Sequence, residues 1–173
     1  MVEPSGAARV KELSESAIRA TAAEPRVADV LFALVRALRP ALVVETGSFL
    51  GHTTYMLGLA VKLNGLGRVV SCDVVEEYVR EARLNCARSF AVDIRWCRGI
   101  ELPELRQADL VFIDSGYADR KEEVLSAKPG AVLLVHDTAR SYDANVEPLD
   151  DWVMSMGGIC LPTERGLGLL IRR

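Results

Sequence analysis

The stretch "LVVETGSFLGHTT", residues 42–54, decides the fold because it places a strand-like apolar run directly before a glycine-containing turn. The run "ALVVET", residues 41–46, is almost continuously apolar, as expected of a strand that is buried on both faces. Gly47 and Gly51 follow it, and a short polar stretch comes next. A strand that leads into a tight glycine turn brings backbone against nucleotide-like ligands in many folds. The stretch therefore predicts a ligand-binding turn at the end of a buried strand.

The spacing of the two glycines separates two classes of cofactor. A dinucleotide needs G-x-G-x-x-G, so that backbone amides at a helix N-terminus meet a pyrophosphate. Here the spacing is G-x-x-x-G, and Glu45 stands two residues before the first glycine. A carboxylate at that place repels a pyrophosphate and favours a ligand with an ammonium group, such as the methionine end of S-adenosylmethionine (SAM). The turn thus favours SAM over a nicotinamide dinucleotide.

Apolar runs of strand length alternate with helical patterns along the rest of the chain. Pro25 suits the start of a helix over residues 26–38, and Pro40 ends it. The expected strands cover residues 41–46, 68–73, 93–99, 108–115 and 130–138, with two short strands in 159–173. The other expected helices cover residues 6–19, 55–63, 76–89, 119–128 and 147–157. This alternation predicts an α/β fold with a Rossmann-like, doubly wound and mostly parallel sheet that ends in an antiparallel C-terminal strand. We interpret residues 1–173 as one domain, with N-terminal helices in residues 1–40.

Composition excludes several classes of partner. Hydrophobic residues make up 50% of the chain and charged residues 26%, and the net charge is −3, which is typical of a soluble globular protein without a nucleic-acid footprint. No stretch has the apolar length of a signal peptide core or of a spanning helix. The four cysteines form no C-x-x-C pair and are interpreted as reduced core thiols. The sequence predicts a cytoplasmic protein with no nucleic-acid or membrane partner; a homodimer through the N-terminal amphipathic segment is one alternative for its oligomeric state.

Acidic and titratable residues end several of the expected strands. In an open α/β sheet the ligand lies outside the carboxyl ends of the strands, so these residues meet at one edge. Asp73 ends the second strand, where its carboxylate suits the two ribose hydroxyls of an adenosine. Asp114 ends the fourth strand, and His136 and Asp137 end the fifth as a titratable pair suited to proton transfer. The alternatives are that Asp73 and Glu45 only cap loops, and that His136 only bonds a nearby carbonyl.

Four motifs in this order resemble those of the class I SAM-dependent methyltransferases. They are Glu45-x-Gly47-x-x-x-Gly51-His52-Thr53, Asp73, "VFIDS" at residues 111–115 and "KPGAVLLVHDT" at residues 128–138. More narrowly, they are similar to the O-methyltransferase branch that includes catechol O-methyltransferase-like enzymes and cephalosporin or macrolide-sugar methyltransferases. The resemblance covers about residues 26–173. It implies transfer of a methyl group from SAM to a small-molecule acceptor, at a hydroxyl group.

The resemblance also implies a role for each residue of the site. The implied cofactor contacts are Glu45 beside the methionine end, Gly47 and Gly51 with backbone against the cofactor, Ser48 and Thr53 at the methionine carboxylate, Asp73 at the ribose, Gly99, Ile100 and Glu101 around the adenine, and Asp114 near the sulfonium and amino group. His136 and Asp137 are the candidate catalytic pair on the ground of their place at the strand end, not of the resemblance.

A divalent cation is a further implication of the resemblance. In metal-dependent relatives the residues equivalent to Asp114 and Asp137 hold an ion such as Mg²⁺, which orients the acceptor hydroxyl. This sequence departs from that pattern, because Thr138 stands where the catechol-type enzymes have Asn. The catalytic Lys of those enzymes is also missing from "IDSGYADR", residues 113–120. We therefore expect weak occupancy by metal and favour His136 over a metal-bound oxygen as the base.

Two other functions stay open at this point. One is a SAM-binding or scaffold protein with little catalytic activity, because few residues are left over for a lid above the site. The other is a nicotinamide oxidoreductase, which the missing G-x-G-x-x-G argues against. Two further interpretations concern single features: the run "RKEEV", residues 120–124, is taken as a solvated helix face, and Trp96 as a core or interface residue.

Overall fold

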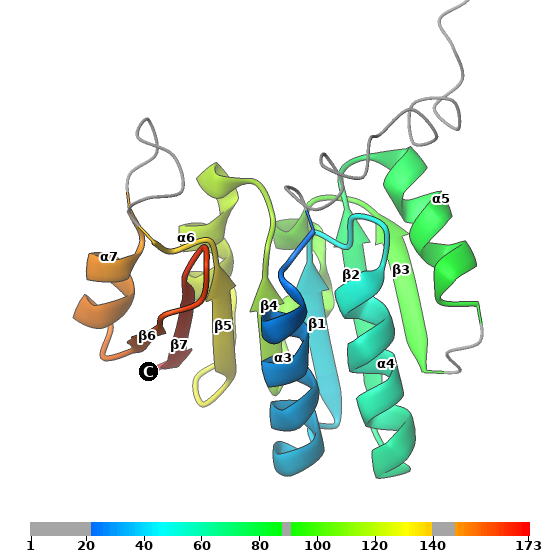
Figure 1. Ribbon diagram of the computed structural model, residues 1–173, viewed down its shortest axis with the longest axis horizontal. Coiled ribbons are helices and arrows are strands. Elements are labelled where there is room, and N and C mark those ends of the chain that lie inside the picture. Colours follow the sequence, from blue (N-terminus) through cyan, green and yellow to red (C-terminus); the bar gives the residue numbers. More distant parts are fainter. Residues whose placement is uncertain (1–21, 88–90, 140–147) are drawn as a thin grey trace, which may run out of the picture.

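The computed structural model describes residues 22–87, 91–139 and 148–173, and places one seven-stranded sheet between two layers of helices (Figure 1). The strands are β1 Leu42–Thr46, β2 Arg68–Asp73, β3 Val92–Trp96, β4 Leu110–Ile113, β5 Val132–His136, β6 Ile159–Leu161 and β7 Leu167–Ile171. The helices are α3 Pro25–Leu38, α4 His52–Asn64, α5 Glu76–Asn85, α6 Tyr117–Ser126 and α7 Asp150–Ser155, with the short 3₁₀ turns η1 Gly99–Glu101 and η2 Pro103–Arg106.

The order of the strands is β3-β2-β1-β4-β5-β7-β6. Strands β1 to β5 are parallel, and β7 pairs antiparallel with both β5 and β6. The order of the strands changes side between β1 and β4: β2 and β3 lie on one side of β1, and β4 and β5 lie on the other. Open α/β sheets bind their ligands at such a switch point. This topology confirms the predicted Rossmann-like, doubly wound fold. The helix expected over residues 6–19 lies outside the described residues.

Each face of the sheet has its own hydrophobic core. Val27, Leu31 and Val35 of α3 pack with Leu57 and Val61 of α4 against one face. On that same face, α5 packs on β3. The other face lies under η1, η2, α6 and α7, whose buried members include Leu102, Leu105, Val124 and Val153. The central strands are therefore buried on both sides, which explains why β1, β4 and β5 are almost continuously apolar.

The apolar side chains of α4 do not all face the core. Tyr55 and Leu63, which bound the helix expected over residues 55–63, are 41% and 55% exposed. Leu57 and Val61 are the buried residues instead. The reason is that α4 packs on both α3 and β2, so its buried surface is wider than a single stripe and is turned toward its neighbour. Among the described residues, the helices lack the length and apolar character needed to cross a membrane.

Candidate functional site

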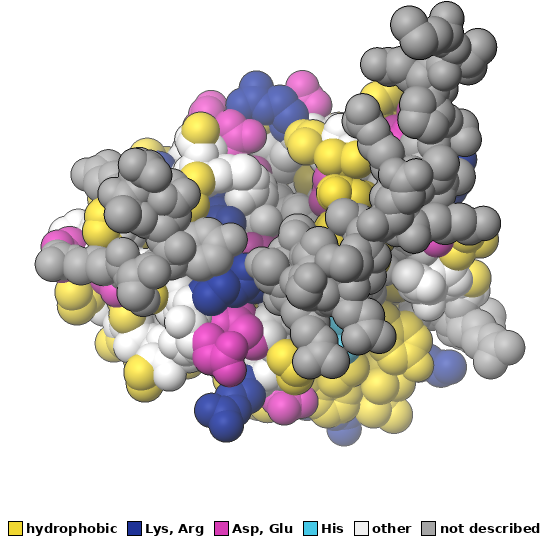
Figure 2. Space-filling model, turned by 45° about the horizontal axis from the view of Figure 1, so that its top comes forward, with side chains coloured by type: hydrophobic (Ala, Val, Ile, Leu, Met, Phe, Trp, Pro, Cys, Tyr) yellow, Lys and Arg dark blue, Asp and Glu magenta, His cyan; other side chains and the backbone are white. Residues whose placement is uncertain are grey.

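The carboxyl ends of β1, β2 and β4 surround a cavity at one edge of the sheet, which we call the edge cavity. Its walls come from the turn after β1, the end of β2, the segment after β3 and the loop after β4. The lining residues are Gly47, Cys72, Asp73, Val74, Cys97, Gly99, Asp114, Ser115, Gly116 and Asp119. Figure 2 looks toward this end of the molecule and shows basic and acidic side chains side by side along its middle. The site thus forms where the topology places it.

Gly47 holds the turn after β1 against the neighbouring strands. Its amide and that of Ser48 donate to the carbonyl oxygen of Cys72, at 2.8 and 2.9 Å. Its φ is +90°, and a Cβ atom there would lie only 2.3 Å from the carbonyl oxygen of Asp114. A side chain at this position would therefore collide with backbone. Gly47 lines the edge cavity, where the sequence placed it.

Gly51 has a different part in the structure. It has φ +85° and forms the N-cap of α4. A Cβ atom there would lie 3.0 Å from Cα of Ala82 in α5. Gly51 does not line the edge cavity, so the geometry gives its predicted contact with a cofactor no support. It allows two helices to approach one another.

Glu45 lies behind the turn rather than in the cavity. Its buried carboxylate accepts hydrogen bonds from three hydroxyl groups, those of Thr53 at 2.5 Å, Ser71 at 2.6 Å and Thr54. Burial raises the pKa of Glu45 to about 7, although the three hydroxyl groups act in the opposite direction. The arrangement does not fit the predicted contact with an ammonium group, because the carboxylate is already surrounded. Glu45 ties β1 to β2 and to the start of α4.

A small hollow beside Gly47 contains the remaining residues predicted for the methionine end. Its lining residues are Ala22, Ala23, Gly47, Ser48, Phe49, His52, Thr53 and Asp114. The Ser48 side chain is 2% exposed, and its hydroxyl has no hydrogen-bond partner among the described residues. An unpartnered buried hydroxyl is unfavourable unless a ligand or water bonds to it. Ser48 therefore suits a polar group of a cofactor, whereas the Thr53 hydroxyl is already donated to Glu45.

Asp73 presents a fixed carboxylate to the edge cavity. One oxygen accepts from the amide of Phe49 and the other from the amide of Val75, both at 2.9 Å. Burial raises the pKa of Asp73 above its ordinary value, and the amide hydrogen bonds oppose that rise. Each carboxylate oxygen has a second lone pair, so both oxygens are still able to accept from a pair of hydroxyl groups.

The segment after β3 supplies the wall predicted for the adenine. Gly99 lines the edge cavity, and Glu101 lines an adjoining hollow with Val74, Trp96, Cys97 and Arg98. Ile100 instead packs against the hydrophobic core on the η1 side. Trp96 is 60% exposed, and its indole nitrogen donates to the carbonyl of Val74 at 3.0 Å. Of the two alternatives given for Trp96, this exposure excludes a core residue but not an interface residue; its side chain lines the adjoining hollow.

Glu123 of α6 is a residue of the site that the sequence did not reveal. Its Oε2 accepts from the hydroxyls of Thr46 at 2.8 Å and Ser115 at 2.7 Å. Its Oε1 comes so close to Gly99 that a Cβ atom there would lie 2.1 Å away. Glu123 is completely buried, and burial raises its pKa above the ordinary value. One carboxyl group thus holds three walls of the edge cavity together.

The interpretation of residues 120–124 as a solvated helix face was wrong. Arg120 is 5% exposed, and Glu123 is not exposed at all. The helical spacing of Arg120, Glu123, Val124 and Ala127 contains a usable signal, because all four fall on one face of the helix. Two of these residues, Val124 and Ala127, are apolar and buried. Their spacing could have predicted that this face of the helix packs against the sheet.

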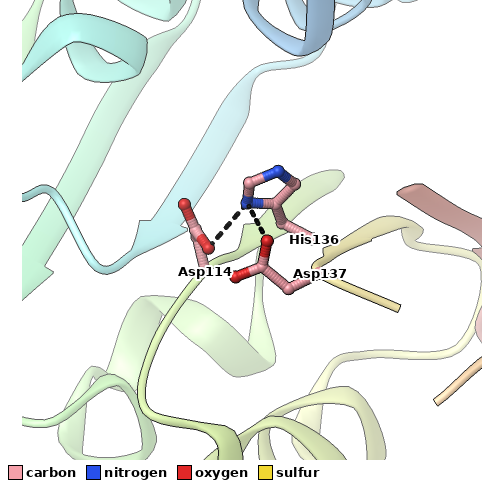
Figure 3. Close-up of side chains that lie close together, drawn as sticks. All are labelled: Asp114, His136 and Asp137. Atoms are coloured by element: carbon pink, nitrogen blue, oxygen red, sulfur yellow. Dashed lines mark hydrogen bonds and ion pairs between the residues drawn. The ribbon is translucent and has the colours of Figure 1, made fainter. Parts of the chain in front are cut away.

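His136 lies at the end of β5 between carboxylates (Figure 3). Its Nδ1 is 2.9 Å from Oδ1 of Asp114 and 3.4 Å from Oδ1 of Asp137, and its Nε2 is 2.5 Å from Oε2 of Glu24. Burial alone would lower the pKa of His136, but the hydrogen bond and the charge of Asp114, with Glu24 and Asp137, raise it to about 9. Both ring nitrogens are therefore engaged by carboxylate oxygens, and neither is free to accept a proton from an acceptor. This environment does not fit the predicted role of His136 as a general base.

Two arginines complete the network around these carboxylates. Nη2 of Arg120 is 3.4 Å from Asp114 and 3.3 Å from Asp137. Arg165, in the loop between β6 and β7, lies 3.3 Å from Asp137 and 3.5 Å from Glu24. Asp137 has φ +55°, and it lines neither the edge cavity nor the hollow beside Gly47. Asp137 is therefore part of a buried ion-pair network, and only Asp114 connects that network with the cavity.

The residues of this network do not fit the divalent cation that the resemblance implied. Ligand atoms of Asp114, His136 and Asp137 lie within 4.8 Å of one another, a spacing at which a metal ion could be held. However, guanidinium groups already contact both carboxylates, and both imidazole nitrogens already contact carboxylate oxygens. A divalent ion would have to displace these partners to gain the lone pairs of its ligands.

A family model described as a methyltransferase domain matches residues 44–138, more than half of the chain. The chain belongs to this methyltransferase family. The matched range begins in β1 and ends just after β5, so it contains every strand end that surrounds the edge cavity. It also contains Gly47 and Asp114, whose backbones approach one another closely at the turn after β1 of this methyltransferase.

Solved structures of similar fold cover almost the whole methyltransferase. The O-methyltransferase TomG from Streptomyces achromogenes, in complex with SAM, is 19% identical with a TM-score of 0.69, over 100% of both chains. The O-methyltransferase from Bacillus cereus, in complex with S-adenosylhomocysteine (SAH), is 21% identical with a TM-score of 0.69, over 100% of this chain and 93% of that one. A methyltransferase from Geobacter sulfurreducens is 18% identical with a TM-score of 0.73, over 99% and 90%. No curated protein sequence gives a significant match.

Proposed function

We propose that this methyltransferase transfers the methyl group of SAM to a hydroxyl oxygen of a small molecule. The observation that carries the proposal is the fixed carboxylate of Asp73 in a cavity at the reversal point of the sheet. Both of its oxygens are oriented by backbone amides, which suits the two hydroxyls of a ribose. The O-methyltransferases from Streptomyces achromogenes and Bacillus cereus, crystallised with SAM and SAH, support the same cofactor.

The reaction is an in-line displacement at the methyl carbon. A lone pair of the acceptor oxygen forms the new C–O bond while the bond from carbon to sulfur breaks, its electron pair stays on sulfur, and SAH leaves as a neutral thioether. The acceptor also loses its hydroxyl proton. The main contribution of the chain is to hold the two reactants in line, because correct orientation alone removes a large part of such a barrier.

Asp114 is the group we propose to receive the acceptor's proton. It lines both the edge cavity and the hollow beside Gly47, whereas His136 and Asp137 line neither. A carboxylate is a weak base toward an ordinary hydroxyl group. We therefore expect acceptors whose hydroxyl is already acidic, such as phenols and enols, rather than aliphatic alcohols.

The test has two parts, because binding and turnover separate the alternatives. Calorimetry with SAM, SAH and NAD measures which cofactor binds; tight binding of NAD without SAM contradicts the proposal. SAH formation is then measured with a panel of phenols, enols and aliphatic alcohols. Binding of SAM without turnover on any hydroxyl would favour the scaffold protein. Faster turnover of aliphatic alcohols than of phenols would contradict the role of Asp114.

Other features of the proposal rest on the sequence. A cytoplasmic location is supported by the four cysteines, which are all free. A homodimer through the N-terminal segment and the absence of a nucleic-acid partner both stay predictions. The proposed methyl transfer at the edge cavity does not depend on either prediction.

A further inference from the structure

Arg120 lies where three side chains of metal-ligand type converge. Asp114, His136 and Asp137 each offer one ligand atom, and these atoms lie within 4.8 Å of one another. The guanidinium of Arg120 contacts Asp114 at 3.4 Å and Asp137 at 3.3 Å. The carboxylates in Figure 3 therefore share a cation that the chain itself provides.

The position of this guanidinium is fixed by backbone as well as by charge. Nε of Arg120 donates to the carbonyl of Ser115 at 2.8 Å, and Nη1 donates to the carbonyl of His136. The side chain is 6% exposed, and its guanidinium stacks 4.9 Å from the ring centroid of Tyr117. Arg120 thus connects the segments after β4 and at the end of β5.

Guanidinium groups already contact the carboxylates of this buried cluster. Arg120 contacts Asp114 and Asp137, and Arg165 contacts Asp137 and Glu24. A divalent ion between Asp114 and Asp137 would lie beside these fixed positive charges. In a poorly solvated place the repulsion is little screened by water.

We propose that Arg120 is the built-in cation of this site: its guanidinium takes the place of a divalent ion between Asp114 and Asp137, and its removal turns the cluster into a divalent-cation site. Without Arg120, Asp114 loses its contact with a guanidinium group, and Asp137 keeps the contact with Arg165. A divalent ion between the two carboxylates would also have Nδ1 of His136 nearby as a nitrogen ligand, since that atom lies 2.9 Å from Asp114 and 3.4 Å from Asp137. Mn²⁺ suits such a mixed oxygen and nitrogen set.

The experiment measures Mn²⁺ binding to the full chain by electron paramagnetic resonance, after treatment with a chelator. The wild type is expected to bind no stoichiometric Mn²⁺. Arg120→Met, which keeps an unbranched apolar stem and removes the charge, is expected to bind one Mn²⁺ at least about tenfold more tightly than the wild type, the effect of removing one like charge near 4 Å. Adding Asp137→Asn to this variant is expected to abolish the gain.

A matched control removes an arginine that joins two carboxylates elsewhere. Arg95 lies 2.7 Å from Asp93 and 2.9 Å from Glu104, with no histidine at that place. Arg95→Met is expected to leave Mn²⁺ binding at the wild-type level. A gain equal to that of Arg120→Met would mean that any freed pair of carboxylates binds the ion, which overturns the proposal.

Folding of the variants is checked by circular dichroism, and Arg120→Gln is the second variant because its amide still donates to a backbone carbonyl. If either variant folds and binds Mn²⁺ no more tightly than the wild type, the proposal is wrong. The wild type decides the matter even if both variants unfold: one tightly bound Mn²⁺ that Asp137→Asn removes would overturn the proposal, and no such binding supports it. These measurements need neither SAM nor an acceptor, so they are independent of the proposed methyl transfer.

Discussion

Replacing Gly47 with alanine tests how the turn after β1 is built. Two costs add at this position. The residue has φ +90°, and a left-handed conformation costs an ordinary residue ~1–2 kcal/mol. The new Cβ would also lie 2.3 Å from the carbonyl oxygen of Asp114, so β1 and β4 must separate at their ends, and such overpacking costs ~1–3 kcal/mol. We expect Gly47→Ala to lower the free energy of unfolding by about 2–5 kcal/mol.

A matched variant isolates the contact from the backbone conformation. Gly130 has φ +84°, and nothing lies within 4 Å of the Cβ that alanine would add. Gly130→Ala should therefore cost only the conformational part, ~1–2 kcal/mol. Urea denaturation of the wild type and both variants measures the difference, and calorimetry with SAM shows whether the cavity survives. Equal loss of stability in the two variants would refute the close approach of Gly47 to Asp114.

Three further predictions concern carboxylates and the histidine of the site. Asp73→Ala should weaken SAM binding by ~1.5–3 kcal/mol, the usual loss of hydrogen bonds to a charged acceptor, with Asp73→Asn in between; unchanged affinity by calorimetry would remove the ribose assignment. The pKa of His136 is raised from about 6.5 to about 9, so its contribution to stability is complete below pH 6.5 and is lost as the pH rises to 9. The free energy of unfolding measured in urea should therefore fall by on the order of 3 kcal/mol over this range. His136→Gln should make the free energy of unfolding nearly independent of pH there. Glu123→Ala should lower the free energy of unfolding by about 2–4 kcal/mol, because it leaves the buried hydroxyl of Thr46 and the partly buried hydroxyl of Ser115 without their acceptor. Glu123→Gln should retain most of the stability, and equal losses in the two variants would contradict the hydrogen bonds.

The sheet was predictable because its signal is local. Strands β1, β4 and β5 are apolar along nearly their whole length, and helical patterns of sufficient length stand between most of them. Burial on both faces follows from such runs without knowledge of the partners. The face of α4 was not predictable in this way, since its partner α3 comes earlier in the chain and its packing against α4 decides which side chains are exposed.

Some residues of the edge cavity could be predicted from their position at the end of a strand, and others could not. Gly47 and Asp73 end strands, and parallel topology brings such ends to one edge. Glu45 lies within β1, where side chains alternate between the two faces. It shares its face with Val43, which packs in the core under α3 and α4, and so points away from the edge cavity. The alternation of side chains within β1 predicts this orientation of Glu45. The motif alone does not, because it assigns a cofactor contact to each of its residues.

The ion-pair network was beyond prediction because each charge is tolerated only by the others. His136 bonds Glu24 across 112 residues of sequence, and no local pattern joins the two. An isolated buried arginine would be strongly unfavourable, so Arg120 is interpreted as exposed until the carboxylates around it are known. The sequence raised doubt about a metal at Thr138, which replaces a ligand, and at the missing catalytic lysine. The structure moves it to Arg120, because a cation already bound between two carboxylates opposes a second one whatever the neighbouring ligands are.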